Sequence, residues 1–322
     1  MVHTDDPTVH QLRLLLTLAE ELHFKHAANR LYLTQPALSQ QIRSLEQRLG
    51  VQLFVRTSRR VELTSTGQIL LPLAKKIVDA TDDLRGAARR ATHRGDQLRI
   101  GVSENAAALA ATRSVLALIS AVYPGIDVAV RVVDFVEQTT VLQDGDVDAA
   151  FVYLPVPDGV RYQPLTTEPR VVCVSSADPL ARRSPVRLAD LADHLVVSLS
   201  TEVFQSGRDF WAVDPRPDGT PVRYTDHHVS RCETLLSAVS FDEAIAFVPA
   251  VMQQLYPRPD VRYLPADDLP PCSFAAVWLE SDHQRSQILV LEDVCRRLRQ
   301  QGLPTPGAMP GPIRLRRPIR SA

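Results

Sequence analysis

Apolar positions repeat with helical spacing in residues 35–49. Leu38, Ile42, Leu45 and Leu49 follow one another at intervals of four, three and four, so they share one face of a helix. The polar side chains of this segment point elsewhere. They are Ser39, Gln40, Arg43 and Gln47. The pattern therefore predicts a helix that packs through one side and offers hydrogen-bonding groups on the other.

The residues before this helix indicate how it begins and what precedes it. The hydroxyl of Thr34 can cap the helix, and Pro36 suits its first turn, where no backbone N–H is needed. The small side chains of Ala27 and Ala28 allow a preceding helix to approach closely. Two short helices with a tight connection are typical of a helix-turn-helix, whose second helix enters the major groove of DNA. An ordinary buried helix pair is the alternative.

Two short strand-like runs follow at residues 53–55 and 61–63, with a basic tip between them. The basic side chains are Arg56, Arg59 and Arg60. A hairpin wing with these arginines suits the minor groove and the phosphates beside a helix-turn-helix. A charged run by itself is more often a solvated turn, but its position directly after the two helices favours the wing.

A long helix with a heptad repeat is predicted for residues 64–92. Its apolar positions alternate in spacings of three and four. They are Leu70, Leu73, Ile77, Ala80, Leu84, Ala87 and Ala91. About 28 residues at 1.5 Å each span about 40 Å, too long for one small domain to cover, so a second subunit is the expected partner. A single core helix of a larger domain is the alternative, and Pro72 could kink either version.

From residue 97 onward strands and helices alternate, which predicts two α/β lobes with parallel sheets. The first series has strands at 98–102, 126–133 and 149–153 and helices at 106–123 and 136–143. The second has strands at 171–175, 195–198, 222–224 and 244–248 and helices at 188–193, 208–213, 231–240 and 249–256. A strand at 274–279 and a helix at 284–301 return the chain to the first lobe. Hinges are expected at 165–170 and 264–273.

Two lobes joined by crossing segments form a cleft, and ligands of open α/β sheets bind outside the carboxyl ends of the strands. Residues that follow the predicted strands, or lie near the cleft wall, are therefore candidates for contacts with a small molecule. They are Ser103, Glu104, Asn105, Phe135, Ser200, Thr201 and Phe247. For each one, an ordinary surface, capping or core role is an equally good alternative.

Charge separates the two ends of the chain. The net charge of the 322 residues is −1, but residues 1–95 carry 14 Lys and Arg against 9 Asp and Glu, or +5, and the remainder carries 22 against 28, or −6. The basic end is the one with the DNA-binding pattern. There is no run of 18 apolar residues and no secretion signal pattern, so we expect a cytoplasmic protein without membrane contact.

Little in the sequence indicates catalysis or a cofactor. The four cysteines are scattered without a metal-like spacing, and we expect buried, reduced thiols. They are Cys173, Cys232, Cys272 and Cys295. A phosphate-cradling glycine motif, G-x-S-x-G and H-E-x-x-H are all lacking, so neither an enzyme nor a bound cofactor or metal is expected.

With these patterns in place, the sequence resembles the LysR-type transcriptional regulators. The shared residues begin near Leu12 and include 22–24, 27–28, 35–42, 45–46, 49–51, 53–54, Arg56 and 63–64. The chain departs from the family at Thr34, where Ser is usual, at residues 65–67, where Pro-Ala-Gly is common, and at 240–245, where a glycine-rich stretch is common. The resemblance covers about residues 8–300, and its motifs are far weaker in the C-terminal part.

The resemblance implies an α+β multidomain protein. A winged helix-turn-helix domain (1–66) precedes a linker helix that pairs two subunits (67–95) and a periplasmic-binding-protein-like effector domain (96–302). Lobe I of that domain comprises about 96–165 and 274–302, and lobe II about 170–265. The Pro-, Gly- and Arg-rich tail at 303–322 is expected to be disordered.

The resemblance also implies a sequence-specific regulator switched by a small molecule. Expected DNA contacts are Thr34, Gln35, Pro36, Ser39, Gln40, Arg43, Arg56, Arg59 and Arg60. Implied partners are a double-stranded DNA operator, a small-molecule effector, further copies of the chain in a homodimer or homotetramer, and RNA polymerase. Activation and repression both fit. The alternative is a two-lobe small-molecule-binding protein or enzyme with an incidental N-terminal helical domain, and the basic wing favours the regulator.

Overall fold

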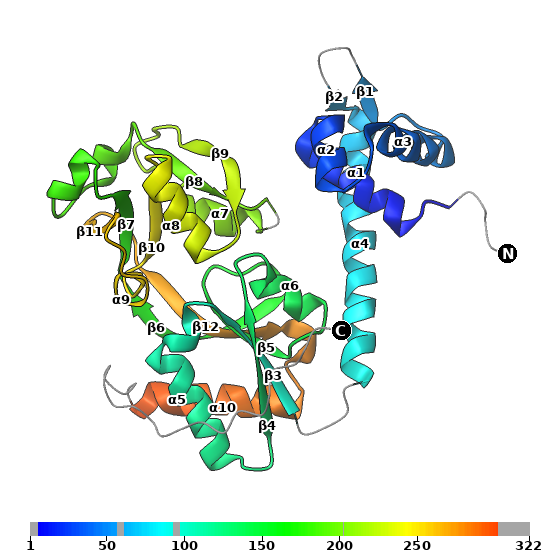
Figure 1. Ribbon diagram of the computed structural model, residues 1–322. Coiled ribbons are helices and arrows are strands. Elements are labelled where there is room, and N and C mark those ends of the chain that lie inside the picture. The colour runs from blue at the N-terminus through cyan, green and yellow to red at the C-terminus, as the bar shows by residue number, and fades with distance from the viewer. Residues whose placement is uncertain (1–5, 57–60, 93–96, 202, 302–322) are drawn as a thin grey trace. The chain divides into compact units, whose positions relative to one another are not determined.

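The computed structural model of the chain describes residues 6–56, 61–92, 97–201 and 203–301 (Figure 1). The chain divides into two compact units, residues 1–88 and 89–322. The predicted wing tip with Arg59 and Arg60, and the predicted tail at 303–322, lie outside the described residues. None of the helices in the described residues could span a lipid bilayer.

The first unit contains three helices, a hairpin and a long fourth helix. Its elements are α1 (Val9–Glu21), α2 (Phe24–Arg30), α3 (Gln35–Leu49), β1 (Phe54–Arg56), β2 (Val61–Leu63) and α4 (Ser65–Thr92). Leu38, Ile42 and Leu45 are fully buried in a core shared with α1 and α2, while Leu49 is half-buried at its edge. The apolar stripe of α3 therefore packs as its spacing predicts.

The long helix α4 has two different apolar faces. Ala74 and Val78 are buried against the core of the first unit, and Leu70 packs partly against it. The rest of the predicted seam is exposed wherever the side chains are described. These residues are Leu73, Ile77, Ala80, Leu84 and Ala87. The first unit therefore covers the face of α4 around Val78, whereas most side chains at the heptad positions are not covered by it.

The second unit begins with the mixed sheet of lobe I. Its strands are β3 (Gln97–Ser103), β4 (Asp127–Val133), β5 (Ala149–Tyr153), β6 (Val160–Glu168) and β12 (Cys272–Leu279), in the order β4-β3-β5-β12-β6. Helices α5 (Ala110–Val122) and α10 (Ser286–Gln301) cover one face, and α6 (Glu137–Gln143) covers the other (Figure 1). Successive side chains of a strand point to opposite faces, so Leu98 and Ile100 pack toward α5 while Ala150 and Val152 pack toward α6.

Lobe II is built around β7 (Arg170–Ser175), which pairs antiparallel with β10 (Ala246–Pro249) and β11 (Val261–Pro265). A parallel pair, β8 (Leu195–Leu199) and β9 (Arg223–Val229), joins it through a bridge between Val196 and Ile245. The helices of this lobe are α7 (Gln205–Ala212), α8 (Cys232–Phe241) and α9 (Met252–Leu255).

Several sequence-based expectations for strands are wrong. Only β3, β4 and β5 are parallel neighbours in lobe I, and β7 runs antiparallel to both of its partners. A run of buried apolar residues has the same pattern in a parallel strand as in an antiparallel one, so the sequence did not predict the strand direction. The segments β6 and β11 were missed. The first hinge expected at 165–170 contains the end of β6, an edge strand that tolerates Pro164 and a bulge at Leu165.

Helix boundaries also differ from the expected ones. The helix expected at 106–123 is a 3₁₀ turn, Ala106–Ala108, followed by α5, because Leu109 between them has an extended backbone. The helix expected at 188–193 is a 3₁₀ turn at Leu188–Leu191, and the one expected at 249–256 reduces to α9. Pro249 is instead the last residue of β10.

Candidate nucleic-acid interface and ligand cavity

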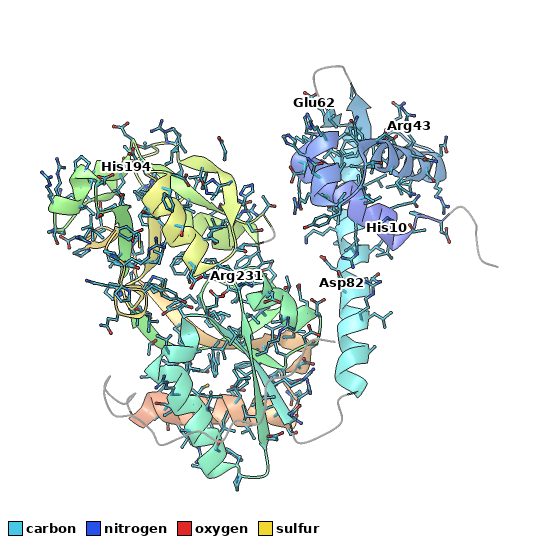
Figure 2. All side chains as sticks on the ribbon, viewed as in Figure 1. His10, Arg43, Glu62, Asp82, His194 and Arg231 are labelled. Atoms are coloured by element: carbon cyan, nitrogen blue, oxygen red, sulfur yellow. The ribbon has the colours of Figure 1, made fainter. Side chains whose placement is uncertain are left out.

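The start of α3 presents polar side chains to solvent. Thr34 is the N-cap, and its hydroxyl accepts the backbone N–H of Ala37 at 3.4 Å. Ser39 is half-buried, whereas the other predicted contacts on this helix are exposed. These are Gln35, Pro36, Gln40 and Arg43. In Figure 2 the side chain of Arg43 extends from α3 away from the neighbouring helices.

Glu46 fixes α3 to the hairpin that follows it. Its Oε1 accepts the backbone N–H groups of Leu53, at 3.0 Å, and of Phe54, at 3.2 Å. On the other side of the helix, the side-chain amide of Gln11 in α1 donates to the hydroxyl of Ser44 at 3.3 Å. The sequence reasoning assigned no role to Glu46, because nothing local shows that a helix carboxylate meets backbone N–H groups seven residues later.

The hairpin pairs Phe54 with Leu63 and Arg56 with Val61. The backbone of Arg56 therefore lies at the described end of the strand pair, while its side chain, like Arg59 and Arg60, lies outside the described part of the structure. Thr64 caps α4, since its hydroxyl accepts the N–H of Gly67 at 2.9 Å. The hairpin thus stands between two helices that are each fixed to its base.

In the second unit a cavity of about 600 Å³, counted to its open mouth, separates the two lobes. Lobe I contributes Ser103, Asn105, Phe135, Gln138 and Tyr153. Lobe II contributes Leu199, Val203, Trp211, Cys232, Leu235, Phe247, Val248, Pro249 and Met252.

Four of the seven residues predicted to contact a small molecule line this cavity, namely Ser103, Asn105, Phe135 and Phe247. The other three do not. Glu104 lies half-buried between two lining residues, and Ser200 donates its backbone N–H to Val229 at 2.9 Å. Thr201 lines a neighbouring cavity instead.

Sequence reasoning missed several residues that the fold brings to the cavity. Tyr153 was placed at the end of a predicted strand, a signal that could have marked it, whereas Trp211 lay inside a predicted helix. The two rings meet edge to face with their centroids 6.1 Å apart. Gln138, Cys232 and Met252 also carried no local signal, because their contribution depends on how distant helices pack.

The polar groups of the cavity wall are largely bonded to one another. The Ser103 hydroxyl donates to Oδ1 of Asn105 at 2.9 Å, and Nδ2 of Asn105 donates to the sulfur of Met252 at 3.6 Å. The Tyr153 hydroxyl donates to Glu168 at 2.6 Å. Burial and the Glu168 carboxylate raise the pKa of Tyr153, and burial raises the pKa of Cys232 to about 12.

A second cavity lies inside lobe II, between α7 and strands β8, β9 and β10. It shares Leu199, Trp211, Leu235 and Phe247 with the first cavity, but its lining also includes charged side chains. These are Arg208, Asp209 and Asp214, with His228 as a further titratable residue. Nδ1 of His228 lies 2.8 Å from the Ser198 hydroxyl. The register between β8 and β9 shifts just before this pair, because β9 has extra residues there.

All four cysteines are buried as free thiols. Burial raises the pKa of Cys173, and it raises the pKa of Cys272 and Cys295 to about 12. The described residues include no group of three or more His, Cys, Asp or Glu side chains that could hold a metal ion.

Comparison with known proteins identifies the family of this chain. A sequence model described as "LysR substrate binding domain" matches residues 91–300, and one described as "Bacterial regulatory helix-turn-helix protein, lysR family" matches residues 9–68. The chain belongs to the LysR family of transcriptional regulators. The resemblance drawn from the helix-turn-helix motif is thereby confirmed, as are the N-terminal helix-turn-helix and the C-terminal two-lobe domain.

LysR-family relatives are similar over most of the chain. The uncharacterized HTH-type transcriptional regulator YnfL of Escherichia coli is 31% identical over 79% of this chain and 86% of its own. The HTH-type transcriptional regulator IlvR of Caulobacter vibrioides is 31% identical over 84% of this chain and 91% of its own. A hydrogen-peroxide-bound mutant of Corynebacterium glutamicum OxyR matches with a TM-score of 0.48, at 27% identity, over 92% of this chain and 94% of its own.

The LysR assignment decides between the two functions left open by the sequence. The relatives are named transcriptional regulators, and the helix-turn-helix is part of the family's own pattern rather than an incidental attachment. The protein is a DNA-binding transcriptional regulator with an effector-binding domain, and not an enzyme.

Proposed function

We propose that this LysR-family regulator binds a paired operator through α3 and the wing, and that a small molecule in the cavity between its lobes controls this binding. The observation that carries the proposal is the division of α3 into a buried apolar face and an exposed polar one. A helix-turn-helix reads base edges with the N-terminal side chains of its second helix, and Gln35 and Ser39 lie there. The wing arginines Arg56, Arg59 and Arg60 then contact phosphates or the minor groove.

The exposed seam of α4 supports an assembly of at least two chains. Three large apolar residues of the seam are well exposed: Leu73 by 49%, Ile77 by 50% and Leu84 by 70%. Apolar side chains at heptad spacing are stabilised when a second helix covers them. Pairing two chains would also place two recognition helices on one operator, and a homodimer or a homotetramer satisfies this requirement.

The cavity between the lobes is the proposed sensor. Ser103, Asn105 and Phe135 of lobe I and Phe247 of lobe II line it, so a ligand there contacts both lobes at once. A ligand shifts an equilibrium between lobe arrangements only by its difference in affinity for them, and contact with both lobes provides such a difference. In this proposal residues 1–66 bind DNA, residues 67–95 connect the subunits, and residues 96–302 bind the small molecule. The protein acts in the cytoplasm, with RNA polymerase as a further partner.

Binding of the full chain to DNA from its own upstream region tests this proposal. Replacing Arg59 and Arg60 by Ala should reduce the slope of log affinity against log salt by about 2, and Arg43→Ala by about 1. Gln35→Ala should instead change sequence preference, because base contacts carry the specificity. Arg182→Ala, an exposed arginine of lobe II, is the matched control. Unchanged salt slopes in all the N-terminal variants would contradict the proposed interface.

A further inference from the structure

The cavity between the lobes has no charged wall. Among its fourteen described lining residues there is no Arg, Lys, His, Asp or Glu. Tyr153 and Cys232 are its two ionisable members, and burial raises the pKa of both far above neutrality. The described lining is therefore neutral at physiological pH, in contrast to the neighbouring cavity with Arg208, Asp209 and Asp214.

Two carboxylates and two arginines lie next to residues that line this cavity, so neither sign of charge predominates around it. Glu168 accepts the Tyr153 hydroxyl at 2.6 Å, and the charge of Glu104 contributes to the raised pKa of Cys232 after the larger effect of burial. Arg170 is buried, but its guanidinium donates to the backbone oxygens of Pro270 and Phe210. Arg231 is exposed at the start of α8 (Figure 2). It is not among the residues that line the cavity.

The start of α8 lies in the wall of the cavity. Cys232 is its first residue, and the N-cap residue Arg231 forms no side-chain cap. The open N–H groups of a helix start correspond to roughly half a positive charge. That partial charge does not offset the cost of removing a full carboxylate charge from water. A neutral carbonyl oxygen accepts the same N–H groups without this cost.

Gln138 is the polar lining residue best placed to select a ligand. Its half-buried side chain has no hydrogen-bond partner among the described residues, whereas Ser103, Asn105 and Tyr153 already have theirs. A glutamine side chain both donates and accepts, so it pairs with an amide or another carbonyl-bearing group. The rings of Phe135, Trp211 and Phe247 surround the same space and favour a planar apolar body.

We infer that the effector is an uncharged, largely apolar ring compound with one amide or carbonyl group that hydrogen-bonds to Gln138. This inference rests on the proposed function, because it names the ligand class of the proposed sensor site. We expect carboxylates and amines of the same shape to bind more weakly, since no described lining residue carries a charge that would compensate theirs.

Isothermal titration calorimetry of the full-length chain with matched ligands tests the inferred ligand class. The probes are benzamide, benzoate and benzylamine, and indole-3-acetamide, indole-3-acetate and tryptamine. We expect at least one amide to bind, and to bind roughly tenfold or more tightly than its own acid and amine. An acid or amine that binds more tightly than its amide in this cavity would overturn the inference, and so would the failure of both amides to bind at millimolar concentration.

Two variants test whether the amide binds in the cavity between the lobes. Gln138→Leu should weaken the amide roughly fivefold, the value of one hydrogen bond, with the fold verified by circular dichroism. Thr201→Trp, which narrows the neighbouring cavity, should leave amide binding unchanged. The opposite pattern, with loss in Thr201→Trp and none in Gln138→Leu, would move the ligand out of the neutral cavity and overturn the inference.

Operator affinity measured with the same ligands separates this inference from the proposed function. If an acid binds in this cavity and alters operator affinity, the ligand class is wrong and the sensor role stands. If an amide binds as expected and operator affinity does not change, the ligand class stands and the sensor role is wrong.

Discussion

The hydroxyl of Tyr153 donates a 2.6 Å hydrogen bond to Oε1 of Glu168, and the other carboxylate oxygen accepts the backbone N–H of Val251 at 2.9 Å. Tyr153 ends β5 in lobe I, Glu168 ends the crossing strand β6, and Val251 precedes α9 in lobe II. One carboxylate thus connects both lobes at the crossing and lies beside the proposed ligand cavity.

Tyr153→Phe should destabilise this unit. Removing the hydroxyl leaves the carboxylate with one fewer donor, which costs about 1.5–3 kcal/mol for a hydrogen bond to a charged group. Tryptophan fluorescence during urea unfolding measures this directly, because Trp211 and Trp278 are the two tryptophans of the chain and both lie in the second unit. Tyr162→Phe is the control, since that side chain is 52% exposed, and an equal effect of the two variants would contradict the prediction.

The buried ion cluster around Asp148 should make the second unit sensitive to acid. Burial alone raises the pKa of Asp148, but hydrogen bonds from Arg99 and the charges of Arg99 and Arg285 outweigh it and hold the pKa below its usual value. The Arg99 side chain bonds both carboxylate oxygens, at 2.9 and 3.1 Å, its backbone N–H donates at 2.8 Å, and Arg285 adds a fourth bond at 2.8 Å. The stabilisation is present above the unfolded pKa of about 3.9 and is lost as pH falls through the folded pKa.

Asp148→Asn should therefore cost about 3–5 kcal/mol at neutral pH, because it leaves two arginines near a neutral side chain, one of them buried. It should also flatten the loss of stability on acidification, measured by the same tryptophan fluorescence. Asp158→Asn, at an exposed position, should change neither quantity. An acid profile identical to that of the unmodified protein would show that Asp148 does not control it.

Gly67 sits where α4 begins against the base of the wing. A Cβ placed there would fall on the backbone oxygen of Leu53, well inside van der Waals contact, and close to the side chain of Leu63. Gly67→Ala should destabilise the first unit by about 1–3 kcal/mol, because backbone rather than a flexible side chain must move. Amide hydrogen exchange in α1 to α4 measures this. Gly125→Ala, with open space around its Cβ, should be neutral, and equal exchange in both variants would refute the clash.

The exposed seam of α4 predicts the effect of a charge at Ile77. Ile77→Glu would bury an unpartnered carboxylate in a helix pair, which costs several kcal/mol and should weaken self-association roughly a hundredfold or more. Sedimentation velocity should show smaller species, and operator affinity should fall with them. Gln68→Glu adds the same charge at an exposed position off the seam and should leave the oligomer intact. A full-sized oligomer of Ile77→Glu would show that the seam is not an interface.

Local sequence determined the helix-turn-helix. The spacing of Leu38, Ile42 and Leu45 fixes which side of α3 is buried, since neighbours three and four residues apart share a helix face in any surroundings. Thr34 and Thr64 act as caps for the same reason, because a cap bonds backbone only three residues away. These interactions are complete within one or two turns, so no tertiary contact was needed to predict them.

Tertiary structure alone decided the strand directions and most of the ligand cavity. The edge strand β6 and the antiparallel strand β11 depend on partners about 90 to 120 residues away, and their own sequences contain prolines and polar residues that do not indicate a strand. Tyr153 and Trp211 meet across the lobes only after both sheets have formed, whereas Thr201 is turned into the neighbouring cavity. Sequence periodicity reports which side of an element is buried, and the fold determines which distant element covers it.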